Sequence, residues 1–275
     1  MHLGSTSEAA FEGEQPTERA DDRLTIGAIS IVAGIVTNVL HEGVGHGLTA
    51  LATGATSGVL TTVAWSSAFD SRLVEAGGTL VNLVAALGFW LLRASVPRSM
   101  AVRYFLLIAF AFNLFSGTGY LFFSGVTDFG DWAFVISGLH PHWLWRMALT
   151  AVGAASYYGA ALAVGIGLVR FVGVSRERAT RLRKLTTIPY FAAIGLSSVA
   201  ALMNPLGIHL LWQSALPATA GGQSGLLWLR YYIPRDAAPQ RGEAFLRRNY
   251  PWVLVAAILA LVFVVLVGPG ITLRR

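Results

Sequence analysis

Long apolar stretches alternate with short polar connections along most of this chain. A helix of about 20 apolar residues is long enough to cross a bilayer. Stretches of this kind occur six times, at residues 24–52, 77–92, 101–123, 147–172, 188–212 and 252–267. Hydrophobic residues make up 55% of the chain and charged residues only 12%, against about 25% charged residues in soluble proteins. The pattern therefore predicts an all-α, polytopic membrane helical bundle with about six transmembrane helices.

The first 23 residues differ from the rest because they are polar and acidic. They lack the basic segment with which a secretory signal begins. We expect residues 1–23 to form a disordered cytoplasmic tail. Residues 24–275 contain no internal repeat and no separate soluble segment, so we expect them to form a single membrane domain.

Basic residues concentrate in two connections between the predicted spans. The connection after the second span carries Arg93, Arg98 and Arg103, and six basic residues lie between positions 170 and 184. Basic connections stay in the cytoplasm, so six spans place both termini there, in a multi-pass protein of the plasma membrane. The connection 214–250 conflicts with this rule. It carries five arginines, but the six-span topology places it on the outer side of the membrane. A hidden half-span at 226–233 would remove the conflict.

Charge and cysteine content exclude several classes of function. The net charge is +6, but the arginines lie at span ends, where membrane topology explains them better than nucleic-acid binding does. We therefore expect the lipid bilayer, and no nucleic acid, as a partner. The chain has no cysteine, which excludes disulfides, thiolate zinc sites, iron–sulfur clusters and a cysteine nucleophile.

The first predicted span contains a polar hexapeptide, HEGVGH, at residues 41–46. An ionised side chain at the centre of a bilayer costs about 2.5–3.5 kcal/mol, so this segment indicates a functional site. Two histidines with a glutamate directly after the first are typical of zinc hydrolases.

The spacing of the two histidines requires a distorted helix. On a regular α-helix, residues five apart differ in direction by about 140°, so His41 and His46 could not share an ion. One extra residue in a π-bulge corrects the phase, and the three nearby glycines make this backbone deformable. Two other interpretations are open at this point. Glu42 and His46 could bind a metal without any bulge, or the segment could be a proton relay or a helix contact.

The lengthened motif resembles the zinc site of the dipeptidyl peptidase III family, and two further stretches resemble the site-2 protease family of intramembrane zinc metallopeptidases. Residues 76–87 are similar to that family's glycine–proline–x–x–Asn segment, with Asn82 as the asparagine and Thr79 in place of the usual proline. Residues 112–132 are similar to its third core helix, which opens on an Asn–Leu pair, here Asn113 and Leu114. This resemblance marks residues 24–135 as a metallopeptidase-like core.

The resemblance also implies a ligand set. Zn²⁺ would be held by His41, His46 and an aspartate after the third core helix. We favour Asp131 over Asp128, because Gly130 gives the backbone freedom to approach the ion. The expected topology agrees, since the first and third spans both end on the outer side of the membrane.

Roles for the other polar residues follow from the same resemblance. Glu42 would act as the general base, Asn82 would contact the substrate backbone or the oxyanion, and Asn113 would support the site without touching the metal. The expected reaction is zinc-assisted hydrolysis of a membrane-embedded or juxtamembrane peptide.

Two alternative functions belong to other classes. The first is a proton- or ion-coupled transporter in which the histidines and carboxylates relay ions. The second is a catalytically silent relative that acts as a membrane interaction protein.

Overall fold

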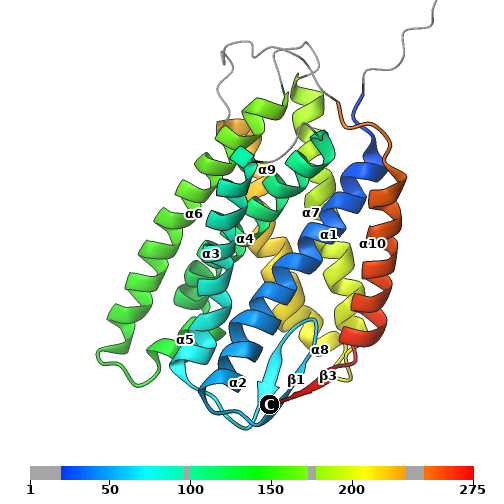
Figure 1. Ribbon diagram of the computed structural model, residues 1–275. Coiled ribbons are helices and arrows are strands. Elements are labelled where there is room, and N and C mark those ends of the chain that lie inside the picture. The colour runs from blue at the N-terminus through cyan, green and yellow to red at the C-terminus, as the bar shows by residue number, and fades with distance from the viewer. Residues whose placement is uncertain (1–19, 96–98, 173–177, 233–244) are drawn as a thin grey trace, which may run out of the picture.

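The computed structural model describes residues 20–95, 99–172, 178–232 and 245–275. The fold is a bundle of long helices with a small sheet at one end (Figure 1). The described helices that are long and apolar enough to cross a membrane are Arg23–Thr53, Arg72–Ser95, Met100–Thr127, His142–Val169, Arg178–Leu202 and Tyr250–Val267. The prediction of an all-α helical membrane bundle is confirmed.

The first span is one continuous helical rod. It consists of α1 (Arg23–Asn38), the π-helix η1 (Val39–Leu48) and α2 (Thr49–Thr53). Asp22 caps the start of this rod, because its carboxylate accepts a hydrogen bond from the backbone N–H of Thr25 at 2.8 Å. The expected distortion at HEGVGH is present, and it extends over ten residues rather than a single bulge.

A three-stranded antiparallel sheet lies at the end of the first span. β1 (Ser57–Leu60) pairs with β2 (Trp65–Ser67) on one side and with β3 (Ile271–Arg274) on the other. Because β3 is the last element of the chain, the C-terminal residues lie at the end of the bundle where the first span finishes.

The central helix is α4 (Met100–Thr127), which packs against α1, α3 (Arg72–Ser95) and α6 (His142–Val172). Its large side chains form the middle of the core, and Phe112 is completely buried there. The short helix α5 (Asp131–Ile136) follows α4 and contacts both α3 and α4. These contacts bring the segment after α4 close to the first span.

The fifth span ends earlier than the sequence predicted. α7 (Arg178–Leu202) stops before Asn204 and Pro205, whereas the predicted span continued to residue 212. Pro205 cannot continue a helical hydrogen-bond ladder, and the chain turns back at this point. Residues 208–232 are then helical without interruption, and we call them the return segment. Its parts are α8 (Ile208–Leu210), η2 (Leu211–Ala215), η3 (Pro217–Gly221), η4 (Gly222–Ser224) and α9 (Gly225–Tyr232).

The return segment runs antiparallel to α7 along the length of the bundle (Figure 1). Ala215 packs with Ala201 near the sheet, and further along the Tyr190 hydroxyl donates to the Ala220 carbonyl at 3.0 Å. Twenty-five helical residues span about 35 Å, enough to cross a hydrocarbon core of about 30 Å. The half-span expected at 226–233, of which residues 226–232 are described, is part of this longer helical segment.

The bundle is completed by α10 (Tyr250–Val262) and the π-helical η5 (Phe263–Val267), which lie beside α1. The outer face of α10 is apolar and exposed, with Leu254 and Leu261 more than 60% accessible. Soluble proteins rarely expose a continuous apolar surface of this kind. These side chains are placed to contact lipid.

A buried ion pair connects the N-terminal ends of α1, α7 and α10 at the end of the bundle opposite the sheet. The Arg181 guanidinium donates to both carboxylate oxygens of Asp21, at 2.7 and 3.2 Å. Asp21 also accepts from the backbone N–H of Leu246, just before α10. The sequence assigned Asp21 and Asp22 to a disordered tail, but both belong to the ordered fold. The rest of that predicted tail, residues 1–19, lies outside the described residues.

Ala20 and Arg275 consequently lie at opposite ends of the bundle. The expectation that both termini share one side of the membrane counted six passages and did not include the return segment, and it stays a prediction. Because the return segment runs the length of the bundle, the basic positions Arg93, Arg103 and Arg230 all fall at the end occupied by Asp21. Arg230 thus lies with the other basic connections in the described residues.

This topology can be tested with single cysteines, because the natural chain has none. We expect Ser99→Cys and Arg275→Cys variants in sealed, oriented vesicles to react with a membrane-impermeant maleimide from opposite sides. Ser66→Cys, in the sheet, should react from the same side as Arg275→Cys. Labelling of positions 99 and 275 from one side would contradict the seven-passage fold.

Candidate metal centre

His41 and His46 project from the same side of the first span because η1 is a π-helix. In a π-helix the backbone hydrogen bonds join residues five apart, which stacks the two histidines along one face. Both residues are buried, at 8% and 4% exposure. Their ring centroids are 4.8 Å apart, with the rings nearly perpendicular.

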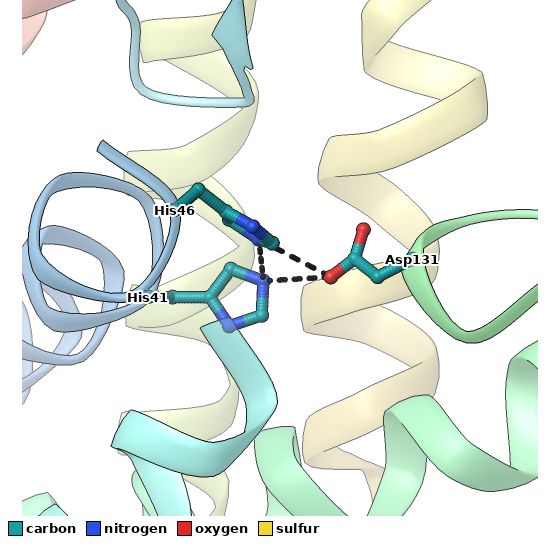
Figure 2. A group of neighbouring side chains, drawn as sticks. All are labelled: His41, His46 and Asp131. Atoms are coloured by element: carbon teal, nitrogen blue, oxygen red, sulfur yellow. Dashed lines mark hydrogen bonds and ion pairs between the residues drawn. The ribbon is translucent and has the colours of Figure 1, made fainter. Parts of the chain in front are cut away.

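Asp131 completes a group of three side chains (Figure 2). Its Oδ2 atom lies 3.4 Å from His41 Nε2 and 3.2 Å from His46 Nε2. The two Nε2 atoms are 3.3 Å from each other. Figure 2 shows the histidines pointing from the first span toward the aspartate, which comes from the segment after α4.

These three distances match the edges of a metal-coordination tetrahedron. Ligand atoms bonded at about 2.0–2.1 Å in tetrahedral geometry stand about 3.3–3.4 Å from one another. Hydrogen bonds between charged nitrogen and oxygen groups are shorter, about 2.7–2.9 Å. Asp131 Oδ2 is inaccessible to solvent and has no hydrogen bond of normal geometry among the described residues.

The other ring nitrogen of each histidine has its own partner, and this partner fixes the tautomer. His46 Nδ1 lies 2.8 Å from the backbone carbonyl of Val74, which can only accept a hydrogen bond. His41 Nδ1 lies 2.6 Å from Asn82 Oδ1, which is also an acceptor. Each Nδ1 therefore carries a proton, and in the neutral form of each ring the Nε2 lone pair is directed toward Asp131.

A buried amide network sets the orientation of Asn82. Its Nδ2 group donates to the Thr37 carbonyl at 3.2 Å and to Asn113 Oδ1 at 2.7 Å. Asn113 in turn donates to the Ala109 carbonyl at 2.8 Å and to the Thr37 hydroxyl. Because the carbonyls of Thr37 and Ala109 accept only, neither amide can be flipped, and the Asn82 oxygen must face His41.

With neutral rings, three acceptor atoms converge, so the group needs a positive charge at its centre. A metal ion, which His41, His46 and Asp131 could hold, would supply that charge, as would protonation of an imidazole. Metal-binding histidines commonly donate their second ring nitrogen to a carbonyl or carboxylate, as both do here.

Glycines allow α3 to approach η1 closely enough to build this group. A Cβ atom on Gly45 would lie 2.4 Å from the Cα of Gly78. A Cβ on Gly78 would lie 2.4 Å from His46 Nε2 and 2.8 Å from His41 Nε2. Gly77 and Gly78 must therefore be glycines, because any larger side chain would overlap the backbone of Gly45 or the two imidazoles.

The structure brings Asp131, and not Asp128, to the histidines. Asp128 ends α4 in the left-handed conformation and pairs with His142 at 2.9 Å, on the surface. Gly130 has φ +83 and lies against the ring of Tyr120. This backbone conformation favours glycine and turns the next residue inward, as the sequence analysis expected for Asp131.

Glu42 is buried beside the group without belonging to it. Its carboxylate is 8% exposed and has no hydrogen-bond partner among the described residues. Glu42 and His41 line a cavity of about 90 Å³ together with Thr62, whose buried hydroxyl also lacks a partner. A cavity of this size, with these polar groups in its wall, has room for a few water molecules.

Asn82 has contacts that differ from its expected role. Its side chain is fully buried, its oxygen faces His41, and both amide hydrogens are used within the protein. We therefore assign Asn82 to orienting His41 and not to contacting the substrate. Asn113 lies one step further from His41, in the supporting position that the sequence suggested.

Two parts of the site, Tyr120 and the Val74 carbonyl, were not predicted from the sequence. Tyr120 lies beside His41, with ring centroids 5.4 Å apart, and it lines the cavity that contains Glu42. Its spacing of seven residues from Asn113 places both on one face of α4, which is a signal that sequence could have provided. The Val74 carbonyl has no such signal, because any residue supplies the same backbone atom.

Comparison with models of known protein families, with characterised proteins and with solved structures found no match to this chain. The description of the site therefore rests on its own geometry.

The choice of ligands can be tested by metal content. We expect wild-type protein to bind one divalent ion per chain, and His41→Ala, His46→Ala and Asp131→Ala each to weaken binding at least about 100-fold, because three protein ligands must act together. Asp128→Ala serves as the matched control and should retain the metal. Elemental analysis after dialysis against a chelator provides the measurement. Retention of metal by Asp131→Ala would contradict the assignment.

The role of the glycine contact can be tested on α3 itself. Gly78→Ala should abolish metal binding, because the new methyl group overlaps both imidazoles. Gly88→Ala places the same methyl group in open space on the same helix and should bind metal normally. Calorimetric titration of both variants with Zn²⁺ measures the difference, and equal affinities would contradict the packing described here.

Proposed function

We propose that this protein is a membrane-embedded zinc metallopeptidase that hydrolyses peptide bonds in membrane proteins or peptides. The observation that carries the proposal is the convergence of two imidazole lone pairs and a carboxylate oxygen at tetrahedral spacing. An unpaired, buried glutamate directly follows the first histidine. The similarity of residues 76–87 and 112–132 to the site-2 protease family supports the same reaction class.

Zinc is the ion that suits this donor set best. Catalytic zinc sites combine three histidine or carboxylate ligands with one open position, whereas magnesium and calcium prefer oxygen ligands. Here His41, His46 and Asp131 would hold the ion. A zinc ion bound in this way acidifies water and polarises a carbonyl group, which is the chemistry that amide hydrolysis needs.

Glu42 is the residue that we assign to proton transfer. It lines the same cavity as His41, so a water molecule there can reach its carboxylate. As general base it takes a proton from the attacking water, and as general acid it then delivers this proton to the leaving nitrogen. Its lack of another partner leaves the carboxylate available for both steps.

The distribution of basic residues supports an orientation in the membrane. Arg93, Arg103 and Arg230 lie at the bundle end opposite the sheet, and such residues remain in the cytoplasm. We therefore infer a multi-pass protein of the plasma membrane with Ala20 on the cytoplasmic side. The sheet, Arg275 and the metal group would then lie toward the outer face.

The central test replaces Glu42 with glutamine. Zinc-loaded protein in lipid nanodiscs is incubated with a library of synthetic apolar peptides of about 20 residues, in water enriched in oxygen-18. Wild type should produce cleaved peptides with the label in the new carboxylate, detected by mass spectrometry. Glu42→Gln should cut at a rate at least about 100-fold lower, the usual effect of losing a general base, with its zinc content unchanged.

A surface carboxylate provides the control for this experiment. Asp70→Asn alters an exposed carboxylate of the connection before α3 and should leave cleavage unchanged. Loss of zinc from Glu42→Gln would make Glu42 a ligand and contradict its role as base. Normal zinc content without cleavage by wild type, together with proton-driven uptake into liposomes, would favour a transporter instead.

A further inference from the structure

A second and larger cavity, of about 580 Å³, lies between α4, α6 and the return segment. Its size falls within the range of about 300–1,000 Å³ that is usual for small-molecule sites. The wall includes Phe122 and Phe123 from α4, Tyr157 from α6, and Pro217 and Trp228 from the return segment. None of the residues that line it carries a charge.

The large cavity adjoins the cavity that is lined by His41 and Glu42. Tyr120, Ser214 and Ala218 line both cavities and lie between them. The larger space therefore begins at Tyr120, whose ring centroid lies 5.4 Å from that of the metal-site residue His41.

The polar groups of the wall are largely occupied. The Tyr157 hydroxyl donates to the Gly222 carbonyl at 2.8 Å and accepts from the Gly225 N–H at 2.7 Å. The cavity thus presents mainly apolar surface and no counter-charge. A charged group that entered it would lose its hydration without gaining a partner, whereas an apolar group would gain from leaving water.

We propose that this cavity is the specificity subsite for a large apolar side chain next to the scissile peptide bond. This inference rests on the proposed function, because it requires a peptide carbonyl at the metal centre. A side chain is the favoured occupant because the cavity begins at Tyr120, beside His41, and because its wall is uncharged. A lipid acyl chain in the same space is an outcome that the experiment must distinguish.

The experiment measures binding of small hydroxamates to zinc-loaded protein in detergent. Acetohydroxamate probes the open position of the metal alone. Dipeptide hydroxamates that carry Gly, Leu, naphthylalanine or Lys next to the hydroxamate probe the cavity. We expect affinity to rise about 10- to 100-fold from Gly to Leu and naphthylalanine, the effect of burying one large apolar side chain. The hydroxamate that carries Lys should bind no better than the one that carries Gly.

Two tryptophan variants on α6 test whether the dependence of affinity on side-chain size arises in this cavity. Ala154 and the adjacent Ala155 are both exposed, but only Ala154 lines the cavity. Ala154→Trp should abolish the gain for Leu and naphthylalanine and leave acetohydroxamate affinity unchanged. Ala155→Trp should bind the whole series as wild type does. Calorimetry provides both measurements without reference to cleavage.

The possible failures separate the two proposals. If zinc-loaded protein does not bind acetohydroxamate, the open metal position and the proposed function fail. If acetohydroxamate binds but side-chain size has no effect, or Ala154→Trp behaves as wild type, the subsite is overturned while the metal chemistry stands. A phospholipid retained by wild type and released by Ala154→Trp in native mass spectrometry, with no side-chain effect, would assign the cavity to lipid and also overturn the subsite.

Discussion

Electrostatic repulsion among three acceptor atoms is the constraint on which the rest of this structure depends. His41 Nε2, His46 Nε2 and Asp131 Oδ2 stand 3.2–3.4 Å apart in a largely apolar bundle, and both Nδ1 atoms already hold the ring protons. An arrangement of this kind is costly without a cation and strongly favourable with one. The π-helix, the glycine contact and the amide network are all devices that bring these atoms together and keep them aligned.

These devices come from separate parts of the chain. η1 stacks the two histidines, α3 supplies Gly78 for space and Asn82 for orientation, and the turn at Gly130 delivers Asp131. The return segment contributes no ligand. It forms part of the wall of both cavities, and its π and 3₁₀ turns lie where irregular backbone is tolerated at membrane depth, next to a cavity.

The sequence predicted those features that depend on local chemistry. The length of apolar stretches predicted the helices, and the spacing of His41 and His46 required the distortion that η1 provides. It did not predict the return segment, because Pro217 and the nearby polar residues interrupt its apolar pattern. The contacts of Asn82 and the position of Tyr120 also escaped prediction, since they depend on how α3 and α4 pack against the first span.

The most direct test of the account is X-ray absorption at the zinc edge of the purified, zinc-loaded protein. The account predicts four nitrogen or oxygen ligands at about 2.0–2.1 Å, with the outer-shell scattering of two imidazole rings. A shell of six oxygen atoms, or the signal of a single imidazole, would show that His41 and His46 do not share an ion, and would contradict the central claim.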